Sequence, residues 1–282
     1  RTTRPRCHLP TQPAMLSTLS HSLFRQPGLT RVLRATAPKI ATRGYIRLET
    51  QKTHGMLTID ELKVKVEAGE IDTVCMAFTD HHGRLVGKRY DADFFLESGA
   101  VDGSHACNYL LTCDMEMTPR DGFSFANWEK GYGDVHMVPD LNSLRVAAWL
   151  PKTAYVLCDV FDGATHKPAA PAPRSVLTRQ VAEAEKEGFC PLAASELEYH
   201  AYKESYSQAH KMKFSGLTPM GSYLEDYHML QGTRFEILNH KARIALKHSG
   251  IPVENSKGEA GFGQHELNVK YSDIVTMCDR HA

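Results

Sequence analysis

The stretch Ser195-Glu196-Leu197-Glu198-Tyr199-His200 carries the most informative local pattern of the chain. Side chains alternate between the two faces of a β-strand, so Glu196, Glu198 and His200 share one face and the intervening Leu and Tyr take the other. Two such glutamates lie about 6.6 Å apart and repel by about 2.5 kcal/mol at an effective dielectric of about 20. Water tolerates that repulsion, whereas a buried face needs a cation. The pair alone therefore leaves open a solvated edge strand and a cation site.

A second group of carboxylates follows in Glu254-Asn-Ser-Lys-Gly-Glu259-Ala-Gly-Phe-Gly-Gln-His-Glu266. The two glycines between Glu259 and Glu266 permit a bulge or a close backbone approach, which lets carboxylates converge from adjoining segments. Carboxylate oxygens suit Mg²⁺ or Mn²⁺, and Mg²⁺ held by carboxylates and substrate phosphates is typical of phosphoryl transfer. His200 and His265 are either further ligands or hydrogen-bonding and surface residues. This second group favours the cation site.

The flanking sequence predicts an α+β fold. Thr58 and Glu61 form a capping-box pattern that begins a helix, and Ser175 is the expected N-cap of a later one. A Pro/Ala-rich connector, His166–Pro173, is a candidate boundary. The expected strands are Ile71–Phe78, Arg84–Tyr90, Thr153–Val160, Leu192–Tyr202 and segments of Val253–Tyr271, and a further helix is expected over Phe235–His248.

Composition excludes several classes of protein. The 282 residues carry 33 Lys+Arg against 33 Asp+Glu, and 42% are hydrophobic, as in an ordinary globular chain. No apolar run of about 18 residues predicts a transmembrane helix. Seven Cys without a C-x-x-C pair are typical of reduced thiols. No P-loop or G-x-G-x-x-G motif is present.

Charge is distributed unevenly along the chain. Residues 1–48 have nine basic and no acidic residues, which leaves 24 basic against 33 acidic in the remainder. The acidic body argues against nucleic-acid binding. Residues 1–48 are Arg-rich and contain Ser and Thr, as in a transit peptide, so they predict mitochondrial targeting. The alternatives are a plastid address, or a disordered basic tail on a cytoplasmic protein.

The glutamate motifs resemble glutamine synthetase. The matching residues are Glu196-Leu-Glu198-Tyr199, followed by Val253-Glu254-x4-Glu259-x4-Gln264-x-Glu266. Phe78-Thr-Asp-x-x-Gly83-Arg-Leu resembles the small N-terminal β-grasp domain of that family, and Gly133-Asp134-x4-Pro139-Asp140-Leu141 its join to the catalytic domain. Ser256-Lys-Gly-Glu259 is closer to the bacterial-type branch that includes γ-glutamylpolyamine ligases. The resemblance implies a β-grasp domain over residues 55–150 and the first part of the catalytic domain over 151–282.

The resemblance also implies roles for single residues. Glu198, Glu259 and Glu266 match the ligands of the metal that faces the acceptor substrate, and Glu196 matches a ligand of the second, nucleotide-side metal. Three further residues match substrate contacts: Glu254 an ATP-contacting glutamate, Tyr271 an aromatic at the nucleotide site, and Asp121, with Ser124, the ammonium-side loop.

The implied activity is an ATP- and Mg²⁺- or Mn²⁺-dependent ligase. It joins glutamate to ammonia through γ-glutamyl phosphate, and the implied assembly is a ring homo-oligomer. A larger amine or polyamine as acceptor, or a non-catalytic relative, are the alternatives. The later Asn-Gly-Ser-Gly-x-His-x-His segment of the family is absent. The 282 residues are therefore expected to be an N-terminal fragment that is inactive alone.

Overall fold

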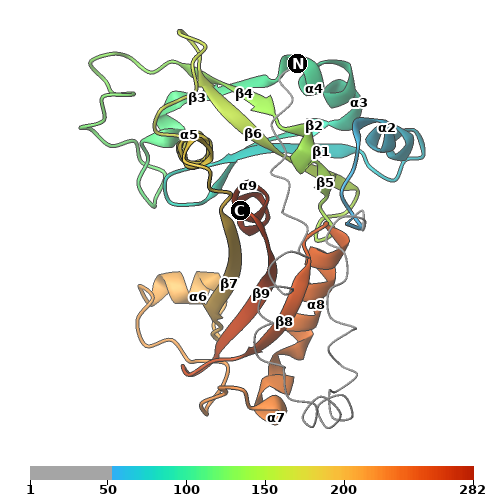
Figure 1. Cartoon of the computed structure of the whole chain (residues 1–282). Helices are drawn as coiled ribbons and strands as arrows, with labels where there is room; N and C mark the ends of the chain where they lie inside the picture. The colour runs from blue at the N-terminus through green and yellow to red at the C-terminus, as the bar shows by residue number, and fades with distance from the viewer. Residues whose placement is uncertain (1–52) are drawn as a thin grey trace, which may run out of the picture. The chain divides into compact units, whose positions relative to one another are not determined.

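The computed structural model describes residues 53–282, which form two β-sheets with helices against them (Figure 1). The expected targeting segment, residues 1–48, lies outside the described residues. Among residues 53–282, no helix combines the length and the hydropathy that crossing a membrane requires.

The first sheet has the strand order β2-β1-β6-β4-β3, with β5 paired to β6. The strand β6 runs parallel to β1 and antiparallel to β4, and the first six of its residues are buried. The bounds are β1 Thr73–Thr79, β2 Leu85–Asp91, β3 Ser104–Cys107, β4 Asp134–Pro139, β5 Arg145–Val146 and β6 Thr153–Asp162. Because β6 lies in the middle of it, this sheet runs past the domain boundary expected at residue 150.

The helix α2 (Ile59–Glu67) begins at the predicted capping box. The Glu61 backbone N–H donates to Thr58 Oγ1 at 3.2 Å, and the Thr58 N–H donates to the Glu61 carboxylate at 2.9 Å. Leu62 of this helix enters the core of the first sheet, together with Met76, Phe78 and Phe95. Short helical segments complete this region: α3 Ala92–Phe94, η2 Phe95–Gly99, α4 Ala100–Asp102, η3 Asn108–Leu111 and η4 Leu141–Ser143.

The second sheet is antiparallel, with the order β7-β9-β8. Its strands are β7 (Leu192–His200), β8 (Val253–Gly258) and β9 (Gln264–Asp273). Along β7, exposed and half-buried residues alternate from the first residue to the last, as the sequence predicted for a strand with one polar face.

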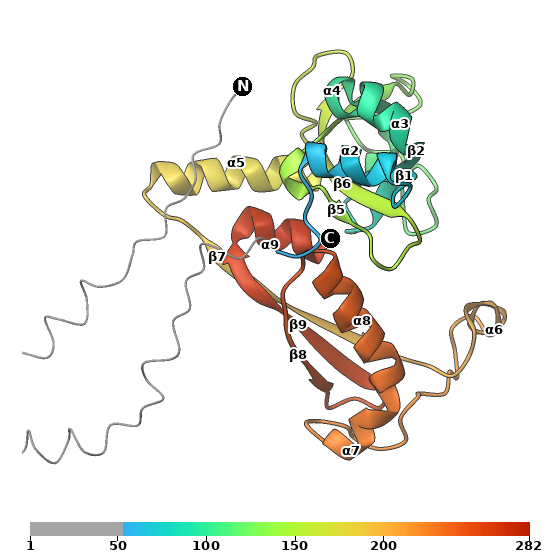
Figure 2. The ribbon, with the colours of Figure 1, turned by 90° about the vertical axis from the view of Figure 1, so that its right-hand side faces the viewer.

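One face of the second sheet is covered by α8 (Glu236–His248) and α9 (Ile274–His281), as Figure 2 shows for α8 along the strands. Its core contains Ile251, Leu267, Val269 and Met277, with Leu197, Ala242 and Leu246 packed against it. The remaining elements are α5 (Pro173–Lys186), α6 (Tyr206–Lys211), α7 (Met229–Gly232) and η5 (Thr233–Phe235). Covering the apolar face leaves the opposite face for the glutamates.

The predicted start of α5 is wrong. The helix begins at Pro173 after Ala172, not after Ser175, because the fixed φ of proline suits the first turn of a helix. This earlier start includes Arg174 in the helix, and its guanidinium pairs with Asp140 at 2.5 Å, with Asp279 at 2.9 Å, and with Asp159. These buried ion pairs join α5 to the first sheet and to α9.

Candidate metal centre

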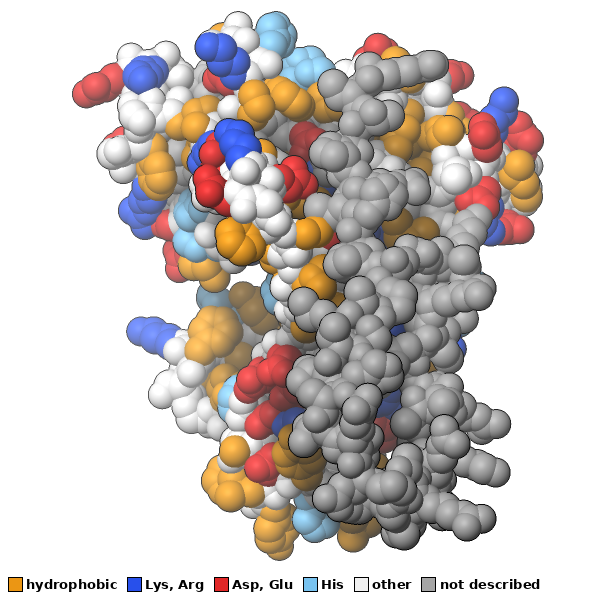
Figure 3. All heavy atoms as spheres, in the orientation of Figure 1, with side chains coloured by type: hydrophobic (Ala, Val, Ile, Leu, Met, Phe, Trp, Pro, Cys, Tyr) orange, Lys and Arg blue, Asp and Glu red, His pale blue; other side chains and the backbone are white. Residues whose placement is uncertain are grey.

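The candidate site lies on the open face of the second sheet. In the strand register, Glu198 of β7 stands opposite Glu266 of β9, and Glu266 stands opposite Lys257 of β8. Directly paired residues of neighbouring strands project from the same face. Three charged side chains therefore form one row across the sheet. In the space-filling view, acidic side chains gather over this part of the molecule (Figure 3).

Lys257 joins the two carboxylates nearest to it. Its Nζ is 3.1 Å from the Glu266 carboxylate and forms a second, shorter ion pair with Glu259. All three side chains are largely buried, with exposed fractions of 18% for Lys257, 18% for Glu259 and 6% for Glu266. Glu259 follows β8 directly, and its backbone N–H donates to the Gln264 carbonyl at 3.0 Å. The β8–β9 turn thus brings Glu259 to Glu266.

The pKa values show how closely these carboxylates interact. The hydrogen bond with Glu266, and then that with Lys257, lowers the pKa of Glu259 to about 2. The same contact with Glu259, together with burial, raises the pKa of Glu266. Burial works against the Lys257 ammonium, but its hydrogen bonds to Glu259 and Glu266 outweigh that and raise its pKa. Negative charge is concentrated here and a cation offsets it.

Glu198 is held by a neighbour. Gln264 Nε2 donates to the Glu198 carboxylate at 2.6 Å, and Gln264 Oε1 accepts from the Gly261 N–H at 2.9 Å. The carboxamide is fixed at both ends, so it orients Glu198 next to its register partner Glu266. Such a contact is typical of the residues that orient metal ligands.

Glu196 lies in the next row of the same face, exposed and opposite Asn268. Within residues 53–282, Asn268 Oδ1 is buried and has no hydrogen-bond partner. A buried carboxamide oxygen without a donor is unfavourable unless a cation or donor approaches it. Glutamate and carboxamide oxygens are the ligands that Mg²⁺ and Mn²⁺ prefer, so the types of residue present suit such an ion.

The carboxylates do not form a complete cage. Among the residues that the structure describes, no three His, Cys, Asp or Glu side chains are placed to hold a metal ion together. The position of Lys257 between Glu259 and Glu266 gives a physical reason, because an ammonium group takes the oxygens that an ion would share.

The opposite face holds a buried polar network under the site. His265 Nε2 lies 2.8 Å from the Glu225 carboxylate, and Asn239 Nδ2 lies 3.0 Å from His265 Nδ1. A carboxamide nitrogen only donates, so Nδ1 accepts and Nε2 donates to Glu225. The Tyr199 hydroxyl donates to Asn239 Oδ1. Of the two roles open to His265, the structure shows the hydrogen-bonding one. His200 is exposed at the end of β7.

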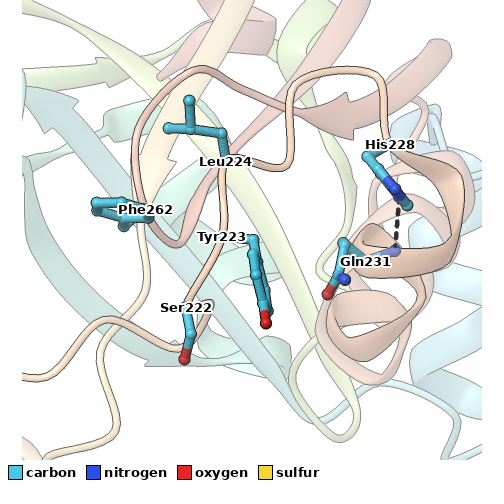
Figure 4. Close-up of a pocket in the computed structure, with 6 residues that line it drawn as sticks. All are labelled: Ser222, Tyr223, Leu224, His228, Gln231 and Phe262. Carbon is cyan, nitrogen blue, oxygen red and sulfur yellow. Dashed lines mark hydrogen bonds between the residues drawn. The ribbon is translucent and has the colours of Figure 1, made fainter.

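A hollow of about 470 Å³ lies beside the β8–β9 turn. It is lined by Ser222, Tyr223, Leu224, His228, Gln231 and Phe262 (Figure 4). Phe262 belongs to the turn between Glu259 and Gln264 and forms a backbone bridge with Leu224. The hollow is mostly apolar and contributes no carboxylate to the site.

Comparison with known proteins identifies the family. Residues 170–282 match the family described as "Glutamine synthetase, catalytic domain". Over 228 residues the chain is 39% identical to gamma-glutamylethanolamide synthetase GlnA4 of Streptomyces coelicolor, an alignment that covers 80% of this chain and 49% of the relative. The chain belongs to the glutamine synthetase family.

Two further comparisons agree with this family. Glutamate–isopropylamine ligase of a Pseudomonas species is 31% identical over 220 residues, covering 77% of this chain and 48% of the relative. A solved structure titled "GmaS/ADP complex-Conformation 1" has a TM-score of 0.60 at 21% identity, covering 78% of this chain and 46% of that one. That structure supports the glutamine synthetase fold. The chain spans about half the length of the curated relatives it matches.

The structure does not bring every predicted residue to the metal cluster. Glu254 is exposed near the start of β8, at an irregularity in its pairing with β9. Tyr271 is 44% exposed, and at about 3.3 Å per residue it lies about 16.5 Å from Glu266 along β9. Asp121 is exposed in a loop between η3 and β4 of the first sheet. Their glutamine synthetase roles remain predictions.

Three residues of the site were not singled out from the sequence as site residues. Lys257 and Gln264 lie within the quoted motifs, but only the strand register shows that they contact the carboxylates. Asn268 comes two residues after Glu266, so strand alternation alone was a signal that it shares the metal face.

Proposed function

We propose that this chain carries the acceptor-side metal site of an ATP-dependent ligase that joins glutamate to an amine. The observation that carries the proposal is the row Glu198–Glu266–Lys257 with Glu259 beside it, a concentration of negative charge held by one internal cation. Membership of the glutamine synthetase family supports it, because the family-matched ligands are these same glutamates.

In this proposal Glu198, Glu259 and Glu266 hold one Mg²⁺ or Mn²⁺ ion, and Glu196 with Asn268 Oδ1 contributes to a second. Bound divalent ions neutralise the charge of a transferring phosphoryl group and align the reactants. The chain supplies rigidity, because Glu198 and Glu266 stand on paired strands and Gln264 fixes the Glu198 carboxylate. The apolar core under α8 keeps those strands in register.

The proposed reaction has two steps. A γ-carboxylate oxygen of glutamate attacks the terminal phosphorus of ATP, which forms γ-glutamyl phosphate and releases ADP. The amine then attacks the acyl carbon, phosphate leaves with the electrons of the broken C–O bond, and the new amide nitrogen loses a proton. Negative side chains around the acceptor side favour a cationic amine before it is deprotonated.

An organic amine is favoured over ammonia as the acceptor. The names of the Streptomyces coelicolor and Pseudomonas relatives contain a γ-glutamylethanolamide product and an isopropylamine substrate. Because the 282 residues are expected to be inactive alone, the screen uses a form of the protein that spans the full length of its relatives. Assays with ATP, glutamate and either ammonia, ethanolamine, isopropylamine or a polyamine then measure the choice as phosphate release and γ-glutamyl product. If ammonia were the only acceptor that gave product, the proposed reaction would be glutamine formation instead.

Metal binding is the direct test, because the cluster lies wholly within a chain that spans only half of each relative. Isothermal titration with Mn²⁺ should show binding by the 282-residue protein and a loss of at least about tenfold in affinity for Glu266→Gln. Glu67→Gln, an exposed change on α2, is the matched control and should bind as wild type does. Equal binding by Glu266→Gln would refute the site, and no binding by any form would favour a non-catalytic relative.

Three wider features are part of the proposal. The first sheet with α2 would be the β-grasp domain of the family, and the protein would assemble as a ring homo-oligomer, which light scattering in solution tests. Residues 1–48 would direct the protein to mitochondria, which a fluorescent fusion of that segment tests.

A further inference from the structure

Lys257 is the only cation paired with the candidate ligands in the part of the chain that the structure describes. Its position is not that of a flexible lysine on the protein surface. Its backbone is fixed in β8 directly opposite Glu266, its side chain is 18% exposed, and its Nζ contacts both Glu266 and Glu259. The ammonium group therefore occupies the oxygens that a divalent ion would need.

A metal ion and this ammonium group cannot share the same two carboxylates without strong repulsion, because like charges a few ångströms apart at low dielectric repel. The form that binds metal is consequently the form in which Lys257 has withdrawn. The apparent affinity for metal is reduced by the fraction of molecules in which the ammonium remains in place.

We propose that Lys257 is an internal cation that holds the metal site closed until a divalent ion displaces it, and that it thereby sets the metal affinity of this protein. The inference rests on the proposed function, since it takes Glu259 and Glu266 as metal ligands. It assigns Lys257 a positioning role and places it outside the metal-binding set.

The structure offers the displaced ammonium a second partner. Lys257 Nζ lies 4.5 Å from the centroid of the Tyr227 ring, within the range of a cation–π contact. Asp226 bridges to Gly258, where a Cβ would stand 2.2 Å from the Glu225 carbonyl oxygen, so the segment before α7 packs tightly along β8. Tyr227 is therefore held beside the lysine, and a short swing keeps the ammonium on the ring after it leaves the carboxylates.

The first test is Mn²⁺ titration of Lys257→Met, Lys257→Arg and the control Lys241→Met. Lys257→Met removes the charge while keeping an unbranched chain, so it should bind Mn²⁺ at least about tenfold more tightly than wild type. Lys257→Arg keeps the charge and should stay near the wild-type affinity. Lys241 is exposed on α8, and its substitution should change nothing.

Stability without metal gives a readout of opposite sign. Removing the counter-charge leaves Glu259 and Glu266 unbalanced, so metal-free Lys257→Met should melt at a lower temperature than wild type and recover when Mn²⁺ is added. A lysine with only a structural role would lower the melting temperature without tightening Mn²⁺ binding, and that result would overturn the proposal.

A second test uses the wild-type protein, so it does not depend on how a variant folds. Brief acetylation followed by mass spectrometry measures the reactivity of each lysine, with Lys241 as the internal reference. Lys257 should be protected without metal and should become several-fold more reactive when Mn²⁺ is bound, because displacement moves its amine from two largely buried carboxylates to the Tyr227 ring, a residue that is 73% exposed.

The outcomes separate the two proposals. If wild type and Lys257→Met bind Mn²⁺ equally, and acetylation of Lys257 does not respond to Mn²⁺, the displacement is refuted while the metal site stands. If neither form binds Mn²⁺, the metal site itself is refuted and the displacement with it.

Discussion

The two sheets of this molecule differ in where their apolar and charged residues lie. The first sheet has β6 at its centre, almost wholly buried, and a large apolar core. The second has one apolar face and one face of carboxylates. Each sheet has an internal cation with acidic partners: Arg174 with three aspartates, and Lys257 with two glutamates.

The two cations differ in what surrounds them. Arg174 of α5 pairs with residues of β6, of α9 and of the segment before η4. Burial works against its charge, but the hydrogen bonds and charges of Asp279 and the other aspartates outweigh burial and raise the pKa of Arg174. A free ion in its place would not be attached to α5, so it would not join α5 to the other elements. Lys257 pairs with two carboxylates of a single hairpin, Glu266 on β9 and Glu259 in the turn after β8, so in our proposal an outside ion takes its place without moving the backbone. We therefore expect the cluster around Arg174 to stabilise the fold, and we propose that only the cluster around Lys257 exchanges its cation.

The largest expected effect is on stability, from Arg174→Ala. It removes the largely buried guanidinium that pairs with Asp140, Asp159 and Asp279, which should cost about 3–5 kcal/mol of the free energy of unfolding. Chemical denaturation measures it, with Arg179→Ala, exposed on the same helix, as the control. Mn²⁺ should not restore the loss. A loss no greater than that of the control would show that this cluster is not structural.

Asn239→Ala tests the covered face of the second sheet. It leaves the Tyr199 hydroxyl and His265 Nδ1 without their partners, which should cost about 1–3 kcal/mol in denaturation experiments. His240→Ala, an exposed change one residue later, should cost much less. Equal losses would mean that the network does not hold β9 in place.

Gln264→Ala tests the open face of the same sheet. Without its carboxamide the Glu198 side chain loses its fixed orientation, so Mn²⁺ affinity should fall by about tenfold while the melting temperature changes little. Titration calorimetry compares it with Gln180→Ala, an exposed change on α5. Unchanged affinity would remove Glu198 from the proposed ligand set.

The smallest effect expected is the pH dependence of Glu259→Gln. The pKa of Glu259 is lowered from 4.5 to about 2, so its carboxylate stabilises the fold above pH 4.5 and that stabilisation is lost as pH falls toward about 2. The difference in melting temperature between wild type and Glu259→Gln should therefore widen as pH rises from about 3 to about 5. A difference that stays constant over this range would contradict the assigned pKa.

Much of the local structure follows from the sequence, because its signals are local. The capping box at Thr58 and the alternation through Glu196 and Glu198 both occur as predicted. The start of α5 was wrong because two local signals, proline and serine, compete within three residues and proline prevails.

The remaining features depend on pairing between distant segments. The parallel pairing of β6 with β1 extends the first sheet past residue 150. The sequence of β6 does not indicate which strand it pairs with. From the sequence alone Lys257 is an ordinary lysine of a strand, and only the register shows that it lies opposite Glu266. Candidate ligands could thus be predicted from residue type and spacing, whereas the cation between them required the register.

The most direct measurement is a crystal structure of the protein grown with Mn²⁺, with anomalous scattering used to locate the ion. The proposed site predicts a peak bound by Glu198, Glu259 and Glu266, with Lys257 Nζ withdrawn from both of its carboxylates. A peak remote from these residues, or none with Lys257 still paired to Glu259 and Glu266, would contradict it.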